Sequence, residues 1–144
     1  MTEREIIENC ACHKVRMAAR AVTRGYDDAL RPVGLRATQL IVLVAVGMEG
    51  SMSITALADV LGMDRTTLTR NLDPLAKDGL IEVGVEGWRR SRAVEITKKG
   101  RSRLREALPL WSRAQENLRG KLGSREWTGV RNSLDQLIQA ASHA

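Results

Sequence analysis

The sequence is poor in aromatic residues, with no phenylalanine, one tyrosine and three tryptophans in 144 residues. Proteins that stack single-stranded bases on aromatic side chains need more rings than this, so that class of nucleic-acid binder is disfavoured. Only two histidines occur, His13 and His143, which leaves little material for acid–base chemistry. We therefore expect a protein that is not an enzyme.

Other motifs are absent as well. The sequence has no glycine-rich phosphate loop, no HExxH, no paired CxxC and no Gly-x-Ser-x-Gly, so we expect no cofactor and no metal. No apolar run approaches the roughly 20 residues that cross a bilayer, and the charged N-terminus lacks the apolar core of a signal peptide. The two cysteines are expected to be thiols. These absences predict a cytoplasmic protein without a membrane partner.

The charge balance is positive, with 23 Lys and Arg against 17 Asp and Glu and a formal net charge of +6. A basic protein favours a polyanionic partner, nucleic acid first. The excess lies in residues 98–144, with ten basic and four acidic side chains, whereas residues 53–97 carry six basic and seven acidic ones. Net charge alone therefore does not indicate where a polyanion would bind.

The first half of the chain predicts two helices. Thr2 and Glu5 have the spacing of a capping box, which predicts a long helix from about Glu3 to Leu30, ended by Pro32 and Gly34. Two apolar rows on this helix indicate a wide contact face. A second helix over Thr38–Met48 is almost wholly apolar and is expected to be buried.

The next segment has the pattern of a helix-turn-helix. Ser53 can cap a third helix, Gly62 and Met63 form a short turn, and Asp64 can cap a fourth helix. The apolar side chains of the fourth helix repeat at helical spacing and should point inward: Leu68, Leu72 and Leu75.

Two alternating apolar runs follow, one over residues 81–85 and one over residues 94–96. Between them lies a loop with three arginines in four positions, Arg89, Arg90 and Arg92. A helix-turn-helix followed by a hairpin with a basic tip is a winged helix. The fold class expected is mainly α with a small β-hairpin wing (α+β).

The C-terminal third predicts a helix from about Thr97, with Pro109 inside it, and a last helix after Gly123 and Ser124. These helices and the first one carry apolar seams that no other segment obviously covers, which favours a homodimer interface over a core within one chain. We expect one domain over residues 1–144. Residues 1–36 and 98–144 would dimerise, and residues 37–97 would form the winged helix-turn-helix lobe.

The fourth helix is the candidate DNA-reading element. With the leucines inward, Thr66 and Arg70 lie on the opposite face, Thr67 and Thr69 flank it, and Arg65 can reach out from the helix start. Arginine offers bidentate donors to guanine in a major groove, and threonine offers a hydroxyl and a methyl group. The wing residues Arg89, Arg90 and Arg92 could enter a minor groove or grip phosphates. The alternative interpretations are a solvated helix face and a loop that charge keeps soluble.

The order of these motifs resembles the MarR family of winged-helix regulators. The stretch from Ser53 to Ile81, the arginine-rich wing, the segment Glu95–Gly100 and the segment Tyr26–Leu35 carry the resemblance, which extends over about residues 5–141. It implies a homodimer that reads a palindromic double-stranded operator, usually as a repressor released by a small phenolic ligand or by thiol oxidation. Trp88 stands where the family usually has an aspartate that braces a wing arginine.

The cysteines invite a second comparison. Cys12 precedes Tyr26 by 14 residues on one apolar row, a spacing that resembles the peroxide-sensing branch of the family, with Arg16 in the place of a second tyrosine. Candidate redox residues are therefore Cys12, Cys10, Tyr26 and Arg16. On a continuous helix Cys10 and Cys12 point about 200° apart and would not bridge without unwinding. Burial as small core residues, a disulfide across the dimer, and soft-metal binding with His13 stay open.

Two function classes compete with a DNA-binding regulator. One is a winged-helix adaptor that binds proteins and never reads DNA, which the acidic balance of residues 53–97 favours. The other is a redox- or metal-responsive thiol protein, or a thiol enzyme that uses Cys12, which the lack of a nearby base other than His13 disfavours.

Overall fold

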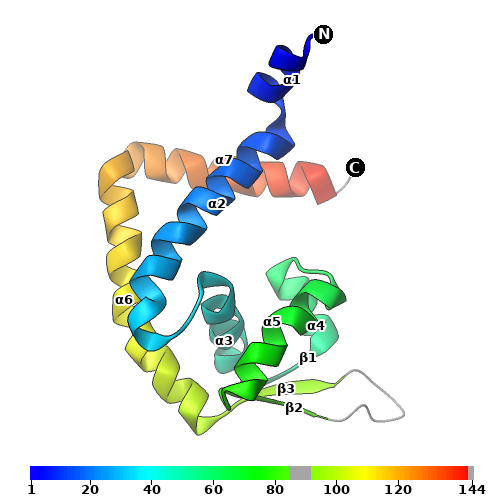
Figure 1. Cartoon of the computed structure of the whole chain (residues 1–144), viewed down its shortest axis with the longest axis vertical. Helices are drawn as coiled ribbons and strands as arrows, with labels where there is room; N and C mark the ends of the chain where they lie inside the picture. The colour runs from blue at the N-terminus through cyan, green and yellow to red at the C-terminus, as the bar shows by residue number, and fades with distance from the viewer. Residues whose placement is uncertain (85–91, 143–144) are drawn as a thin grey trace.

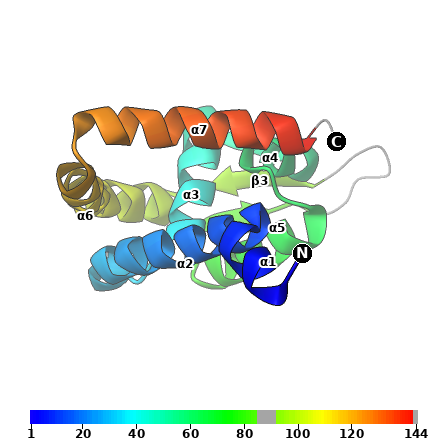
Figure 2. The same cartoon turned by 90° about the horizontal axis from the view of Figure 1, so that it is seen from above.

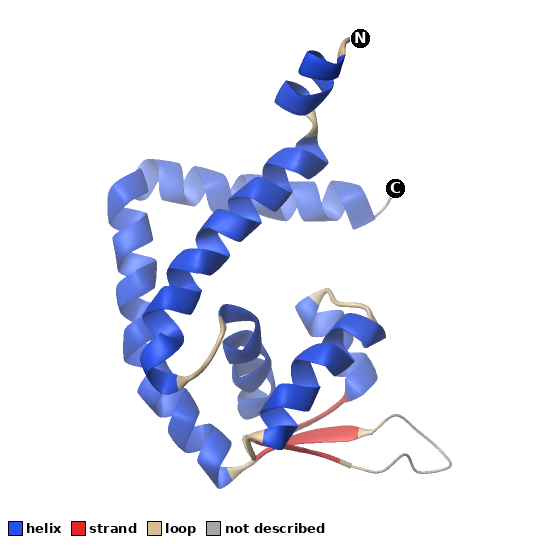
Figure 3. Cartoon of the chain, viewed as in Figure 1, coloured by secondary structure: helices blue, strands red, loops and turns tan. Residues whose placement is uncertain are grey.

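The computed structural model describes residues 1–84 and 92–142, and these residues form helices and one small sheet, which lies at one edge of the molecule (Figures 1 and 3). In chain order the elements are α1 (Glu3–Asn9), α2 (Ala11–Leu30), the 3-10 helix η1 (Arg31–Val33), α3 (Ala37–Glu49), β1 (Ser51–Ser53), α4 (Ile54–Leu61), α5 (Arg65–Lys77), β2 (Ile81–Val83), β3 (Ala93–Ile96), α6 (Lys98–Leu122) and α7 (Ser124–Ser142). The fold class is the predicted one, mainly α with a small antiparallel sheet.

The N-terminal helix is interrupted, and the prediction of one helix from Glu3 to Leu30 is wrong at Cys10. The capping box is present, with the Thr2 hydroxyl accepting from the Glu5 backbone N–H at 3.2 Å. Cys10 has an extended backbone (φ −66°, ψ 112°) and is both the C-cap of α1 and the N-cap of α2. Neither proline nor glycine stands at the break, so composition carries no signal for it.

Helix α3 forms the centre of the core. Val42, Leu43 and Val46 are fully buried in it, and α4, α5, β3 and α6 pack around it. The nearly continuous apolar sequence of this helix is explained by burial on most of its faces. Figure 1 shows α3 between α6 on one side and the α4–α5 pair on the other.

The sheet has three antiparallel strands in the order β1-β3-β2. The predicted hairpin is β2 with β3, in which Ile81 pairs with Ile96 and Val83 with Val94. Strand β1, whose Met52 pairs with Val94, was not predicted, because a strand of three residues is too short to show alternation. The predicted end of the first strand, Val85, lies outside the described residues.

Basic residues near the start of α6 attach that helix to the lobe. The Lys99 ammonium donates to the carbonyl of Asp78 at 2.7 Å, and the Arg103 guanidinium donates to the carbonyl of Val33 at 2.9 Å. Arg101 reaches the carbonyl of Gly47 at 3.4 Å. These carbonyls lie at or near the C-terminal ends of α5, η1 and α3, where cations are favourable. The surplus charge of residues 98–144 is thus partly structural.

The terminal helices extend away from the lobe. Figure 2 shows α2 and α7 on opposite sides, joined through α6, and no residue of α1 or α7 is buried. Within the described ranges no single helix has the length and apolarity to span a membrane. Two consecutive segments, residues 11–33 and 37–49, meet that test only as a pair bent by 71°.

Candidate nucleic-acid interface

Helix α5 is held in place by its cap and by its apolar stripe. The Asp64 carboxylate accepts from the Thr67 backbone N–H at 2.7 Å and from the Thr67 hydroxyl at 3.0 Å. Gly62, at φ +63°, makes the tight turn from α4, a backbone conformation that glycine adopts without strain. The side chains of Leu68, Leu72 and Leu75 are buried as predicted.

These hydrogen bonds also set the protonation of the cap. The backbone N–H of Thr67, followed by its hydroxyl, holds the pKa of Asp64 below its ordinary value. Asp64 is therefore a carboxylate at neutral pH and stays available as an acceptor for the first turn of α5.

The predicted reading residues all lie on the exposed side of α5: Arg65, Thr66, Thr67, Thr69 and Arg70. Two of their hydroxyls are already used as donors within the protein, since Thr67 donates to Asp64 and Thr69 donates to the carbonyl of Arg65 at 2.8 Å. The methyl groups and oxygen lone pairs of these threonines stay available. Arg65, Thr66 and Arg70 are the remaining donors on this face.

The wing is described only at its base. Arg92 is exposed directly before β3, and its carbonyl accepts from the Ile54 backbone N–H at 2.9 Å, which fixes the strand to the start of α4. Arg89 and Arg90 lie outside the described residues. The structure therefore places one of the three predicted wing arginines, beside the helix-turn-helix.

A cavity of about 370 Å³ between α5 and the start of α3 was not predicted. Its lining contains Arg70 together with residues that sequence reasoning missed: Arg36, Thr38, Gln39, Asn71 and Pro74. Arg36 precedes α3 without any periodic or motif signal, so only the packing of α3 against α5 brings it to Arg70.

The structure does not bring the candidate redox residues together as one site. Cys12 and Arg16 are exposed one turn apart on α2, and Cys10 is half-buried at the helix break. Tyr26 lies 14 residues after Cys12 on α2, which is about 21 Å at 1.5 Å per residue. The Tyr26 hydroxyl donates to the side-chain oxygen of Gln115. The helical-angle argument against a Cys10–Cys12 bridge does not apply, because Cys10 is not inside a helix.

No group of three His, Cys, Asp or Glu side chains among the described residues could hold a metal ion.

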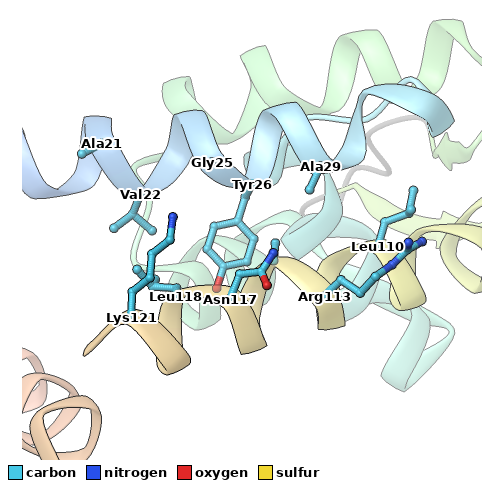
Figure 4. Close-up of a pocket in the computed structure, with 11 residues that line it drawn as sticks. Ala21, Val22, Gly25, Tyr26, Ala29, Leu110, Arg113, Asn117, Leu118 and Lys121 are labelled. Atoms are coloured by element: carbon cyan, nitrogen blue, oxygen red, sulfur yellow. The ribbon is translucent and has the colours of Figure 1, made fainter. Parts of the chain in front are cut away.

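Tyr26 separates two cavities beside α6. A groove of about 540 Å³ runs between α2 and α6 (Figure 4), with small side chains on α2 and the polar residues Arg113, Asn117 and Lys121 on α6. A second cavity of about 310 Å³ lies between α2, α3 and α6. Burial raises the pKa of Tyr26, so its hydroxyl stays protonated and donates at neutral pH.

The second cavity has a mostly apolar lining. It is formed by Tyr26, Ala37, Leu40, Ile41, Val44, Leu108 and Trp111. It lies where the long helices α2 and α6 meet α3 of the lobe.

Comparisons with known proteins agree with this geometry. Residues 33–91 match the model of the MarR family. A solved structure of the M. tuberculosis transcriptional regulator MosR in complex with DNA is 39% identical, with a TM-score of 0.84 over 94% of this chain and 98% of that one. A mutant of E. coli MarR complexed with operator DNA is 21% identical, with a TM-score of 0.82 over 95% of this chain and 99% of that one, and shares the fold. An uncharacterised HTH-type regulator of Bacillus subtilis, YwoH, is 24% identical over 65% of this chain and 69% of its own length.

Proposed function

Because the chain belongs to the MarR family of DNA-binding transcriptional regulators, we propose that it is a homodimeric repressor of a palindromic operator. Release would come from a small ligand or from thiol oxidation. The observation that carries the proposal is the exposed basic face of α5, which lies next to a hairpin with Arg92 at its base. The fold is shared with a 39% identical regulator whose structure is a complex with DNA.

In this proposal α5 enters a major groove and the wing follows the adjacent minor groove. Arg65, Thr66, Thr67, Thr69 and Arg70 would face the DNA, and Arg89, Arg90 and Arg92 would extend from the hairpin. A B-DNA major groove accepts an α-helix, and narrow minor grooves favour arginine. Each lobe would read one half-site, so a two-fold dimer would read a palindrome.

The proposed domain division is a lobe over residues 37–97 and dimerisation helices over residues 1–36 and 98–144. Support comes from large apolar side chains that stay exposed in a single chain. On α1 and α7 they are Ile6, Ile7, Val130, Leu134, Leu137 and Ile138. A row of such residues on long helices is typical of a surface that a partner covers. The seam of α6 is divided, because Leu104 packs against the core of its own chain whereas Leu108, Trp111 and Leu122 stay exposed.

The proposed effector site is the apolar cavity beside Tyr26 and Trp111. Its lining favours a small aromatic molecule, and the Tyr26 hydroxyl, which donates its proton to Gln115, could orient that molecule as an acceptor. A ligand there would contact α2, α3 and α6 at once. Because α6 is hydrogen-bonded to the end of α5 through Lys99 and Asp78, a shift of α6 would move the reading helix.

The thiol alternative places oxidation at Cys12. Its side chain is exposed, with Arg16 one turn away on the same helix. Cys10 is the second thiol, at the break that precedes α2. Tyr26 would take part only through a contact that a partner subunit supplies, because within one chain it lies far along α2.

The test of the proposal is selection of duplexes from a random library, followed by anisotropy titration against a scrambled duplex. We expect a Kd of about 10⁻⁸–10⁻¹¹ M for the selected site and a steep loss of affinity with salt. Arg65→Ala should weaken binding to the selected site by roughly 10- to 100-fold, whereas Arg105→Ala on α6 should change it little. Equal affinity for selected and scrambled duplexes would favour the protein-binding adaptor instead.

A further inference from the structure

The cavity between α3 and α5 has the chemistry of an anion site. Five of its six lining residues carry hydrogen-bond donors and none carries a carboxylate: Arg36, Thr38, Gln39, Arg70 and Asn71, beside Pro74. Two arginines from different elements thus border one space. Like charges in such an arrangement are favourable only if an anion or solvent lies between them.

The ion pairs of the described residues support this reading. Arg31, close by on η1, is paired with Asp28 at 2.5 Å. Neither Arg36 nor Arg70 lies within 4.0 Å of a carboxylate in the part of the chain that the structure describes. Within that part of the chain Arg36 and Arg70 thus form no close ion pair, although Arg70 acts on Asp64 at longer range, whereas Arg31 is paired.

Two amide side chains are already oriented by the protein. The Gln39 side-chain oxygen accepts from the Arg36 backbone N–H at 2.9 Å, so its NH₂ group is left to donate elsewhere. The Asn71 NH₂ group donates to the carbonyl of Thr67 at 3.0 Å, which holds this side chain against α5. The donors available to an anion are then the two guanidinium groups, the Gln39 amide and the Thr38 hydroxyl.

The position of the cavity identifies the anion. At about 100° per residue, Arg70 lies on the border between the side of α5 that carries Thr66 and Thr69 and the side that carries Asn71 and Pro74. Its place in the cavity lining puts it with the second group. A helix in a major groove about 12 Å wide has a row of phosphates along each flank. The flank of α5 towards α3 would therefore meet the DNA backbone.

We propose that Arg36 and Arg70, with Thr38 and Gln39, clamp one backbone phosphate of each operator half-site, so that Arg70 anchors the reading helix and does not read a base. The inference rests on the proposed function. It revises the expectation that Arg70 pairs with guanine, and it adds Arg36, which no motif indicated. Phosphate contacts fix register and orientation and carry no sequence information themselves.

The test is a set of anisotropy titrations of the full-length protein on the selected operator and on a scrambled duplex, over a range of KCl concentrations. The variants are Arg36→Ala, Arg70→Ala and the control Arg31→Ala. We expect the first two each to weaken binding to both duplexes by a similar factor, about tenfold. The slope of log K against log salt should become shallower in each variant. It should change by about two per dimer in the Arg36→Ala, Arg70→Ala double variant, in which the clamped phosphate of each half-site has lost both cations. Arg31→Ala should change neither quantity.

Two further experiments test whether the two arginines contact a phosphate. Arg36→Lys and Arg70→Lys retain the charge, so they should recover the salt slope while losing part of the affinity. Replacing single operator phosphates by neutral methylphosphonates should identify one phosphate per half-site whose loss weakens the wild type but not the Arg36→Ala, Arg70→Ala double variant.

The outcomes separate this inference from the function beneath it. If Arg70→Ala selectively reduces preference for the operator over the scrambled duplex, Arg70 reads a base and the clamp is wrong. An unchanged salt slope in both alanine variants also overturns the clamp, while the protein still binds its operator. If the wild-type protein binds neither the operator nor the scrambled duplex, the proposed function itself is wrong.

Discussion

Gly100, in the first turn of α6, lies against the backbone carbonyl of Leu80, which follows the end of α5. A Cβ built at Gly100 would overlap the Leu80 oxygen and crowd the Ile96 side chain. The same junction is held by the Thr97 backbone N–H, which donates to the Leu80 carbonyl at 3.1 Å, and by the Thr97 hydroxyl, which donates to the Gly79 carbonyl at 2.6 Å. The segment that directly follows the reading helix and the first turn of α6 thus meet with their backbones in contact.

Gly100→Ala is therefore expected to destabilise the fold. Backbone atoms cannot move aside as a flexible side chain can, so the overlap should cost about 1–3 kcal/mol or more in the free energy of unfolding. Gly120→Ala on the same helix is the matched control. A Cβ there meets nothing within 4 Å, and the change should stabilise by up to about 1 kcal/mol. Denaturant unfolding of both variants measures this, and equal stability of Gly100→Ala and wild type would contradict the tight contact.

Asp64 gives a prediction about acid. Its pKa is lowered from the ordinary 3.8 by the hydrogen bonds from Thr67. A lowered pKa in the folded state means stability that is present above 3.8 and lost as the pH falls through the folded-state value. Asp64→Asn should keep the cap but lose this part of the pH dependence, and Asp64→Ala should also lower Tm at neutral pH. Thermal melts between pH 7 and pH 3 measure both, and parallel pH profiles for wild type and Asp64→Asn would exclude this role.

The sequence predicted those elements whose signal is local. The caps predicted at Thr2, Ser53 and Asp64 each accept the expected backbone hydrogen bond. The inward leucines of α5 follow from periodicity alone, because one face of that helix is buried and the other is not.

What could not be predicted depends on packing between distant segments. The first helix breaks at Cys10, where no glycine or proline indicates a break, and β1 is too short to show an alternating apolar pattern. Arg36 and Arg70 line the same cavity only because α3 packs beside α5. The apolar seam of α6 suggested a partner helix, but only part of it is free. Leu104 packs against the core of the same chain and Gln115 accepts from Tyr26, whereas the remaining exposed seam residues are Leu108, Trp111 and Leu122. A sequence pattern shows that a face is apolar but not what covers it.

The α7 face tests the proposed dimer. Ile138 is 63% exposed in a single chain and lies beside Leu134 and Leu137 on one side of the helix. Ile138→Asp would place a charge in the interface, so we expect monomers at micromolar concentration and loss of high-affinity operator binding. Asn132→Asp, on the opposite side of α7, should leave the dimer intact. Sedimentation equilibrium measures the mass. If the Ile138→Asp variant is still a stable dimer, α7 is not part of the dimer interface.

The thiol alternative predicts a response to hydrogen peroxide. A peroxide-reactive Cys12 thiolate is oxidised to a sulfenic acid, with one peroxide oxygen added to sulfur and hydroxide released. Operator affinity should then fall in the wild type and stay unchanged in Cys12→Ser, with recovery on adding a thiol reductant. Cys10→Ser shows whether the second thiol is needed. If operator affinity still falls with peroxide in Cys12→Ser, Cys12 is not the thiol that senses peroxide.

The effector cavity can be tested by filling it. Salicylate serves as a small phenolic probe, and Trp111 in the lining should report its binding through a change in fluorescence. Val44→Phe adds a ring inside the cavity, so we expect this variant to bind operator as the wild type does but to lose both the fluorescence change and any release of DNA by the probe. Met48→Phe is the matched control, because Met48 lies one turn further along α3, is 78% exposed and does not line the cavity. If Val44→Phe still responds, the ligand binds elsewhere, and the groove between α2 and α6 becomes the site to block next.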